Sequence, residues 1–109
     1  MTEDEFNQLF IEVIDESLST LGEAAKAAVY YHVEQKFGLT KEEIPRNVEN
    51  FTEALEKIFG IGSKPIEVLF MQRLYLKVKS DCGPISYEEF TFPKYVDMIR
   101  EKIVSKDKA

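Results

Sequence analysis

The sequence predicts an all-α protein, folded as a compact bundle of about five helices. Apolar residues recur three or four positions apart in five separate segments, which is the spacing of an amphipathic helix. Helix-capping residues precede most of these segments, and glycine or proline interrupts the chain between them. Residues 85–92 are rich in aromatic and β-branched side chains that favour an extended stretch, but the sequence offers no second strand to pair with it.

The first helix is expected over residues 3–18, because Thr2 and Glu5 have the spacing of a capping box. Its inward side is formed by Phe6, Leu9, Phe10, Val13, Ile14 and Leu18. Thr20 and Glu23 have the same spacing and predict a second helix that ends at Gly38. The expected inward side of that helix consists of Ala25, Ala28, Val29, His32, Val33 and Phe37.

A single helical turn is expected next, because Thr40 and Glu43 can cap it while Pro45 prevents it from continuing. Asn50 is the expected start of a short third helix, which Gly60 ends. The inward side chains of this helix are Phe51, Leu55, Ile58 and Phe59.

The fourth helix is expected to begin with Ser63 as its N-cap and to end before the loop of residues 80–84. Its inward side consists of Ile66, Leu69, Phe70, Leu74 and Val78. Thr91 is the expected N-cap of the last helix, and Pro93 lies in the first turn. The inward side of the last helix consists of Phe92, Val96, Ile99 and Ile103.

The length of 109 residues predicts one domain over residues 1–109, with a polar tail at 105–109 that is expected to fray. Eight Phe and five Tyr supply enough apolar surface to exclude disorder as the main state. The longest apolar run, residues 27–31, is too short to cross a membrane. The acidic N-terminus lacks the basic and apolar regions of a signal peptide, so a cytoplasmic location is expected.

Charge is unevenly distributed along the chain, whose formal net charge is −6. Residues 1–16 contain six acids and no base, whereas residues 64–79 hold four bases and one acid, a net charge of +3. The acids of the first helix complement its dipole, and alternatively they could dock on a basic surface of a partner or of a second copy. The overall acidity makes nucleic acid an unlikely partner, and residues 64–79 are the one segment that suits DNA.

The sequence gives no indication of a catalytic or metal-binding constellation. His32 is the single histidine and Cys82 the single cysteine, too few for a metal site built from these residues. No pair of carboxylates has a spacing that marks it for acid–base chemistry. We therefore predict no enzyme activity, no catalytic residue, no metal and no cofactor.

One glycine-rich turn is a candidate anion-binding site. It consists of Gly60, Gly62, Ser63 and Lys64 at the start of the fourth helix, where backbone N–H groups and a lysine can hold an anion. No strand precedes the turn, so it lacks the setting of a phosphate-binding loop or a dinucleotide fold. Alternatively, the two glycines simply end one helix and begin the next.

Four aromatic residues form a candidate partner surface. Phe6 and Phe10 lie beside the acidic residues of the first helix, where exposed apolar side chains would suit a docking partner. Tyr30 and Tyr31 are adjacent on the second helix and point to different sides, so at most one of them is in the core. The other is a candidate contact residue, because tyrosine is enriched at interfaces.

Residues 20–79 carry several features in a fixed order. They are Leu21-Gly22-Glu23, Tyr30-Tyr31-His32, Phe37-Gly38, Glu43-Ile44-Pro45, Ala54-Leu55 and Phe59-Gly60-x-Gly62-Ser63-Lys64. In this order they resemble a small archaeal helical domain of unknown mechanism, found alone or as the output domain attached to sensory proteins. The resemblance implies a non-enzymatic signalling or regulatory role.

The favoured prediction is a regulatory or signalling module that acts through protein–protein contacts, with another protein or a second copy in a homodimer as its partner. The main alternative is a small anion- or nucleotide-sensing domain that uses the turn from Gly60 to Lys64. A DNA-binding helical domain based on residues 64–79 is less favoured, because the chain as a whole is acidic.

Overall fold

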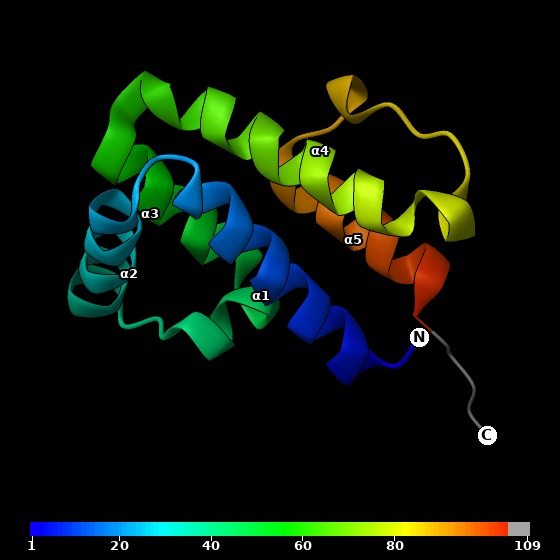
Figure 1. Cartoon of the computed structure of the whole chain (residues 1–109), viewed down its shortest axis with the longest axis horizontal. Helices are drawn as coiled ribbons and strands as arrows, with labels where there is room; N and C mark the ends of the chain where they lie inside the picture. The colour runs from blue at the N-terminus through cyan, green and yellow to red at the C-terminus, as the bar shows by residue number, and fades with distance from the viewer. Residues whose placement is uncertain (105–109) are drawn as a thin grey trace.

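Five α-helices follow one another in the computed structural model, which describes residues 1–104 (Figure 1). The helices are α1 (Glu3–Ser19), α2 (Glu23–Phe37), α3 (Val48–Phe59), α4 (Ser63–Cys82) and α5 (Phe92–Ile103). Three short 3-10 segments join them, η1 (Lys41–Arg46), η2 (Gly60–Gly62) and η3 (Tyr87–Glu89). The described residues contain no strand, so the predicted all-α bundle is confirmed. The predicted frayed tail, residues 105–109, lies outside the described residues.

The helices pack around α1, which crosses the middle of the molecule (Figure 1). It contacts α2, η1 and α4, while α5 packs on α3 and α4. At one end, α2 packs on α1 and α3. The segment between α4 and α5 turns back alongside α4 and carries η3 (Figure 1).

Five phenylalanine rings connect four helices through the core. The ring centroids of Phe6 and Phe10 are 6.2 Å apart, and Phe10 lies 6.0 Å from Phe92. Phe92 lies 5.4 Å from Phe70, which is in turn 6.0 Å from Phe51. Each of these side chains is at most 1% exposed. Because buried aromatic side chains remove the most apolar area from water, this row contributes strongly to stability.

Three of the predicted caps are confirmed. Thr2 Oγ1 accepts a hydrogen bond from the Glu5 N–H at 3.1 Å, and the Glu5 carboxylate accepts one from the Thr2 N–H at 2.9 Å. Thr40 and Glu43 form the same reciprocal pair at the start of η1. Thr91 caps α5, as its hydroxyl accepts a hydrogen bond from a first-turn N–H. These capping bonds satisfy backbone donors that have no partner within the helix.

The capping box predicted for α2 is wrong. Thr20 belongs to the end of α1, where its hydroxyl donates to the Ser17 carbonyl oxygen at 2.6 Å. The residue before α2 is Gly22, whose φ of 107° is one that side-chain-bearing residues rarely adopt. Thr20 is therefore the C-cap of α1, and Gly22 takes the N-cap position of α2.

Two further helix starts differ from the prediction. The third helix begins at Val48 rather than Asn50, because η1 ends directly before it and the Val48 side chain is buried in the core. Ser63 is the first residue of α4 rather than its N-cap, since η2 leads into the helix without a break. Local capping patterns located these helices to within a few residues.

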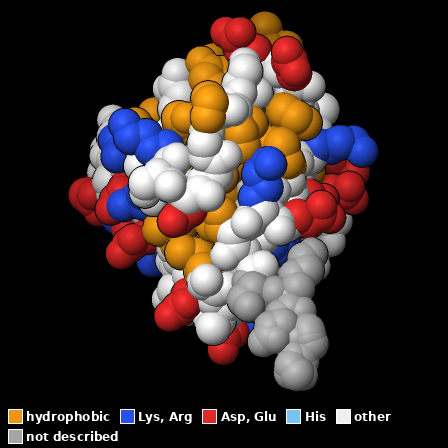
Figure 2. Space-filling model, turned by 90° about the vertical axis from the view of Figure 1, so that its right-hand side faces the viewer, with side chains coloured by type: hydrophobic (Ala, Val, Ile, Leu, Met, Phe, Trp, Pro, Cys, Tyr) orange, Lys and Arg blue, Asp and Glu red, His pale blue; other side chains and the backbone are white. Residues whose placement is uncertain are grey.

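The end of the molecule that carries both termini has a mixed surface. Figure 2 shows hydrophobic side chains there interspersed with lysine or arginine and acidic side chains. None of the helices of residues 1–104 combines the length and the apolar character that a membrane crossing requires.

Candidate functional site

The acidic side of α1 is paired with the basic residues of α4 in the same chain. Lys77 Nζ lies 3.4 Å from the Glu16 carboxylate and 3.8 Å from that of Glu12. The Arg73 guanidinium lies 3.7 Å from Glu16. Each exposed pair contributes only about 0.2–1 kcal/mol. Together they hold the acidic side of α1 against the basic residues of α4. Few unpaired carboxylates therefore remain on this side of α1 to attract a basic partner.

Tyr30 is turned inward to a polar cluster around Asp15. The Tyr30 hydroxyl donates to the Asp15 carboxylate at 3.0 Å, and the ammonium groups of Lys26 and Lys41 lie 3.2 and 3.0 Å from it. Burial alone would raise the pKa of Asp15, but hydrogen bonds from Lys41, Lys26 and Tyr30 lower it below its usual value. Burial and the Asp15 charge raise the pKa of Tyr30. The cluster ties α1, α2 and η1 together.

The prediction that Phe6 and Phe10 form a partner surface is wrong. Both side chains are fully buried, because α4 and α5 cover the apolar side of α1 and Phe10 stacks against Phe92. A partner could reach them only if the core opened. Of the four predicted contact residues, Tyr31 is the exposed one, at 62%.

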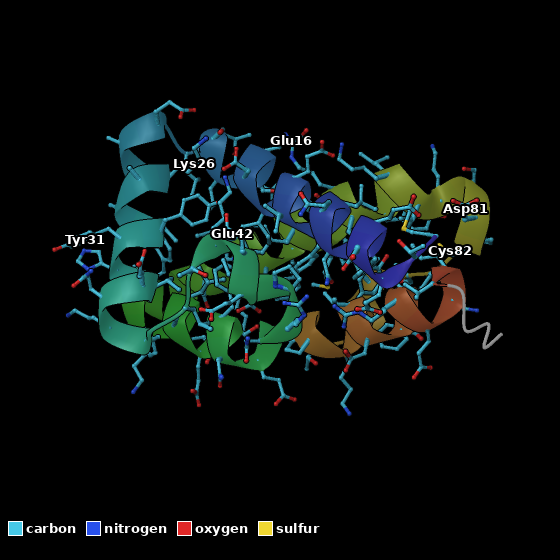
Figure 3. The ribbon with its side chains drawn as sticks, turned by 90° about the horizontal axis from the view of Figure 1, so that it is seen from below. Glu16, Lys26, Tyr31, Glu42, Asp81 and Cys82 are labelled. Atoms are coloured by element: carbon cyan, nitrogen blue, oxygen red, sulfur yellow. The ribbon has the colours of Figure 1, made fainter. Side chains whose placement is uncertain are left out.

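Exposed apolar residues cover the outer side of α2, which we call the α2 outer face. It consists of Leu21, Ala24, Ala27, Ala28 and Tyr31. The spacing of three or four residues places Ala24, Ala27, Ala28 and Tyr31 on one side of the helix, and Leu21 lies just before the helix begins. Figure 3 shows Tyr31 pointing away from the rest of the molecule. The prediction that Ala28 faces inward is wrong, since Val29 and Val33 fill the buried side of α2.

The candidate anion-binding turn lies beside two carboxylates. Gly60, with φ of 60°, ends α3, and η2 leads from it into α4. Lys64 is exposed, and its Nζ lies 3.9 Å from the carboxylates of both Glu56 and Glu67. These two negative charges compete with any anion for the lysine.

Glu67 of α4 is a buried acid that is not among the predicted site residues. It is 4% exposed, and its Oε2 has no hydrogen-bond partner within residues 1–104. Burial raises the pKa of Glu67, and the charge of Glu56 raises it further, while the charge of Lys64 and a hydrogen bond with the Ser63 hydroxyl lower it. A signal was present, because Glu67 is in helical register with the core residues Phe70, Met71, Leu74 and Val78.

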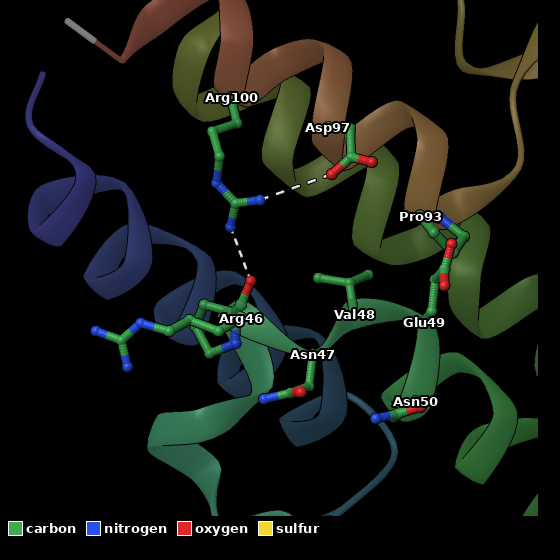
Figure 4. A pocket seen from close by; sticks show the side chains of 9 residues that line it. Arg46, Asn47, Val48, Glu49, Asn50, Pro93, Asp97 and Arg100 are labelled. Atoms are coloured by element: carbon green, nitrogen blue, oxygen red, sulfur yellow. Dashed lines mark hydrogen bonds and ion pairs between the residues drawn. The ribbon is translucent and has the colours of Figure 1, made fainter. Parts of the chain in front are cut away.

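A polar hollow of about 250 Å³ lies between η1, the start of α3, and α5 (Figure 4). Its main cation, Arg100, donates to the Pro45 carbonyl oxygen at 2.8 Å and lies 3.7 Å from Asp97. The same guanidinium is 3.0 Å from Glu3 and lies over the Phe6 ring at 4.8 Å. Arg100 is therefore engaged in holding α5 to η1 and α1.

The structure does not bring the two most reactive side chains together. Cys82 ends α4, at the opposite end of the molecule from α2, which carries His32 (Figures 1 and 3). Burial raises the pKa of the Cys82 thiol, which disfavours the nucleophilic thiolate. Within residues 1–104, no three His, Cys, Asp or Glu side chains are grouped as metal ligands would be.

No protein-family model, curated protein or solved structure matches this chain. The resemblance of residues 20–79 to archaeal output domains therefore stays a prediction.

Proposed function

We propose that this chain is a non-enzymatic regulatory module that acts through protein–protein contacts, with the α2 outer face as its contact surface and a second copy of the chain as its partner. The observation that carries the proposal is that α2 is apolar on two sides while the fold covers only one. Val29 and Val33 are buried, whereas Ala24, Ala28 and Tyr31 are exposed. Apolar side chains that gather on one exposed side of a helix are a candidate contact surface.

The chemistry of the α2 outer face suits a symmetric contact. In a two-fold dimer the same patch meets itself, so charged residues at its centre would meet like charges. The five residues of this face carry no charge. Its three alanines allow a partner helix to approach closely, and Tyr31 supplies a large contact side chain. A contact built on one helix is smaller than a standard interface, so we expect a weak dimer that depends on concentration.

The test is the oligomeric state of matched variants by sedimentation velocity over a range of concentrations. Tyr31 and Leu76 are both 62% exposed, but Leu76 lies on α4. We expect the wild-type chain and Leu76→Glu to dimerise alike and Tyr31→Glu to remain monomeric. A wild-type chain that stays monomeric at the highest concentration would contradict the proposal. A dimer that is lost in Leu76→Glu but kept in Tyr31→Glu would also contradict it.

Anion sensing at the turn from Gly60 to Lys64 is the second, weaker proposal. The exposed ammonium of Lys64 favours it, while Glu56 and Glu67 at 3.9 Å weigh against it. A titration with phosphate, followed through backbone amide shifts, provides the test. An absence of shifts at Gly62, Ser63 and Lys64 at millimolar phosphate would rule this function out.

A further inference from the structure

A hollow of about 300 Å³ lies between α4 and the segment that carries η3, and its wall contains the buried carboxylate of Glu67. The other lining residues include the apolar side chains of Val68, Met71, Tyr87 and Phe90. We propose that this hollow binds small aliphatic ammonium ions, with Glu67 as the counter-ion and Tyr87 and Phe90 as aromatic walls.

The carboxylate of Glu67 is the first reason for this assignment. Its side chain is 5% exposed, and the nearest cation, Lys64 Nζ, is 3.9 Å from Oε1, beyond hydrogen-bond distance. Oε2 has no hydrogen-bond partner within the described part of the chain. The Ser63 hydroxyl lowers the pKa of Glu67, so the carboxylate is partly compensated, but burying an acid whose second oxygen has no donor is still costly. An ammonium group in the hollow would add a closer positive charge than Lys64 and further hydrogen-bond donors.

The aromatic residues are the second reason, and contacts elsewhere in the fold hold them in place. The Tyr87 hydroxyl accepts a hydrogen bond from Gln72 Nε2 at 3.0 Å, which fixes η3 against α4. The Phe90 ring packs 6.0 Å from that of Tyr95 in α5. Faces of aromatic rings attract organic cations, and a wall that is already ordered loses little entropy when a ligand binds.

The balance of charge around the hollow also favours a cation. Glu67 and Glu88 line it together with one base, Lys64, and Glu56 lies 3.9 Å from the same lysine. The three acids outweigh the single base. Lys64 is 71% exposed, so its flexible side chain can move aside for a ligand. Carbon-rich walls and a single buried carboxylate suit an alkylammonium better than a divalent metal, which needs several oxygen ligands.

The hollow is built from α4, η3 and the start of α5, whereas the proposed contact surface is on α2 (Figure 1). Amine binding at the hollow and dimerisation through α2 can therefore be tested independently of each other. A variant at Tyr31 should leave amine binding unchanged, and a variant at Glu67 should leave dimerisation unchanged.

The test uses the full chain labelled with ¹⁵N and titrated with n-pentylammonium chloride, and with 1-pentanol as the uncharged match. We expect saturable amide shifts in α4 around Glu67 and in residues 87–90 at millimolar pentylammonium. Pentanol should bind at least about tenfold more weakly. No saturable shift, or equal affinity for the two probes, would overturn the proposal.

Two matched variants locate the counter-ion. Glu67→Gln keeps the shape of the side chain and removes its charge, so pentylammonium affinity should fall about tenfold while pentanol affinity does not change. Glu88→Gln removes the exposed carboxylate of the same hollow and should change affinity by less than about threefold. Thermal melts establish that both variants are folded. Pentylammonium affinity that is unchanged in folded Glu67→Gln would contradict the assignment.

Discussion

The first two helices differ in how completely the rest of the chain covers them. The apolar side of α1 is buried, as in Phe6 and Phe10, and its acidic side is paired with Arg73 and Lys77 of α4. Only one side of α2 is covered, and the α2 outer face remains exposed. A cluster of charge was the more conspicuous feature of the sequence, yet the structure neutralises much of it within the chain. The candidate contact surface is the modest stripe of alanines ending at Tyr31.

The largest change in the free energy of unfolding should come from truncating a side chain on the buried side of α1. Phe10 is fully buried and stacks on both Phe6 and Phe92, so Phe10→Ala should lower the free energy of unfolding by about 3–5 kcal/mol. Urea denaturation measures this change. On α2, Tyr31→Ala should change the free energy of unfolding by less than about 0.5 kcal/mol. Similar losses in the two variants would contradict the contrast between the helices.

The Asp15 cluster joins the two helices and should give the next largest effect. Asp15→Asn removes the charge that Tyr30, Lys26 and Lys41 surround, and we expect a loss of about 1–2 kcal/mol at neutral pH. The pKa of folded Asp15 is lowered, so its contribution is present above the unfolded-state pKa and lost as pH falls through the folded-state pKa. The difference between wild type and Asp15→Asn should therefore shrink in acid. A difference that is constant with pH would argue against the cluster.

Neutralising the buried acid of α4, Glu67, should raise the free energy of unfolding, whereas Asp15→Asn lowers it. At neutral pH the ionised Glu67 side chain is buried without full compensation, so Glu67→Gln should raise the free energy of unfolding by about 1 kcal/mol. Because burial raises the pKa of folded Glu67, its protonated form is favoured, and the gain should vanish as pH falls below the unfolded-state pKa. Chemical denaturation at neutral and acidic pH measures both. A loss of stability at neutral pH would mean that Glu67 is stabilised by groups other than those described.

The smallest effect should be the coupling between α1 and α4. A double-mutant cycle of Glu16→Gln and Lys77→Gln should give a coupling of about 0.5 kcal/mol in low salt, reduced in high salt. Thermal unfolding of the four proteins measures it. Zero coupling in low salt would indicate that the two helices are not paired through these side chains.

The sequence predicted the fold class well, because helical periodicity and capping reflect local physics. The capping box of Thr2 and Glu5 and the left-handed Gly38 that ends α2 lie where the pattern indicates. Thr20 shows the limit, since a capping pattern does not reveal to which of two adjacent helices a residue belongs. Periodicity also assigned Ala28 to the wrong side, because alanine carries little preference for either face.

The candidate sites were less predictable, because they depend on which helices meet. Periodicity placed Phe6 and Phe10 on an apolar stripe but could not show that α4 and α5 cover it. It also could not show that Lys77 reaches Glu16 within the chain. The hollow beside Glu67 requires residues of α4 and η3 that are about twenty positions apart in the sequence. Only the core register of Glu67 could have indicated it in advance.

Sedimentation velocity of the wild-type chain and of Tyr31→Glu, each at low and high salt, tests the central claim that the α2 outer face is a contact surface. Because this face is uncharged, the wild-type dimer should persist in high salt, while Tyr31→Glu should be monomeric in both conditions. A dimer that dissociates in high salt and survives Tyr31→Glu would contradict the account, because it would show that charged residues outside α2 hold the copies together.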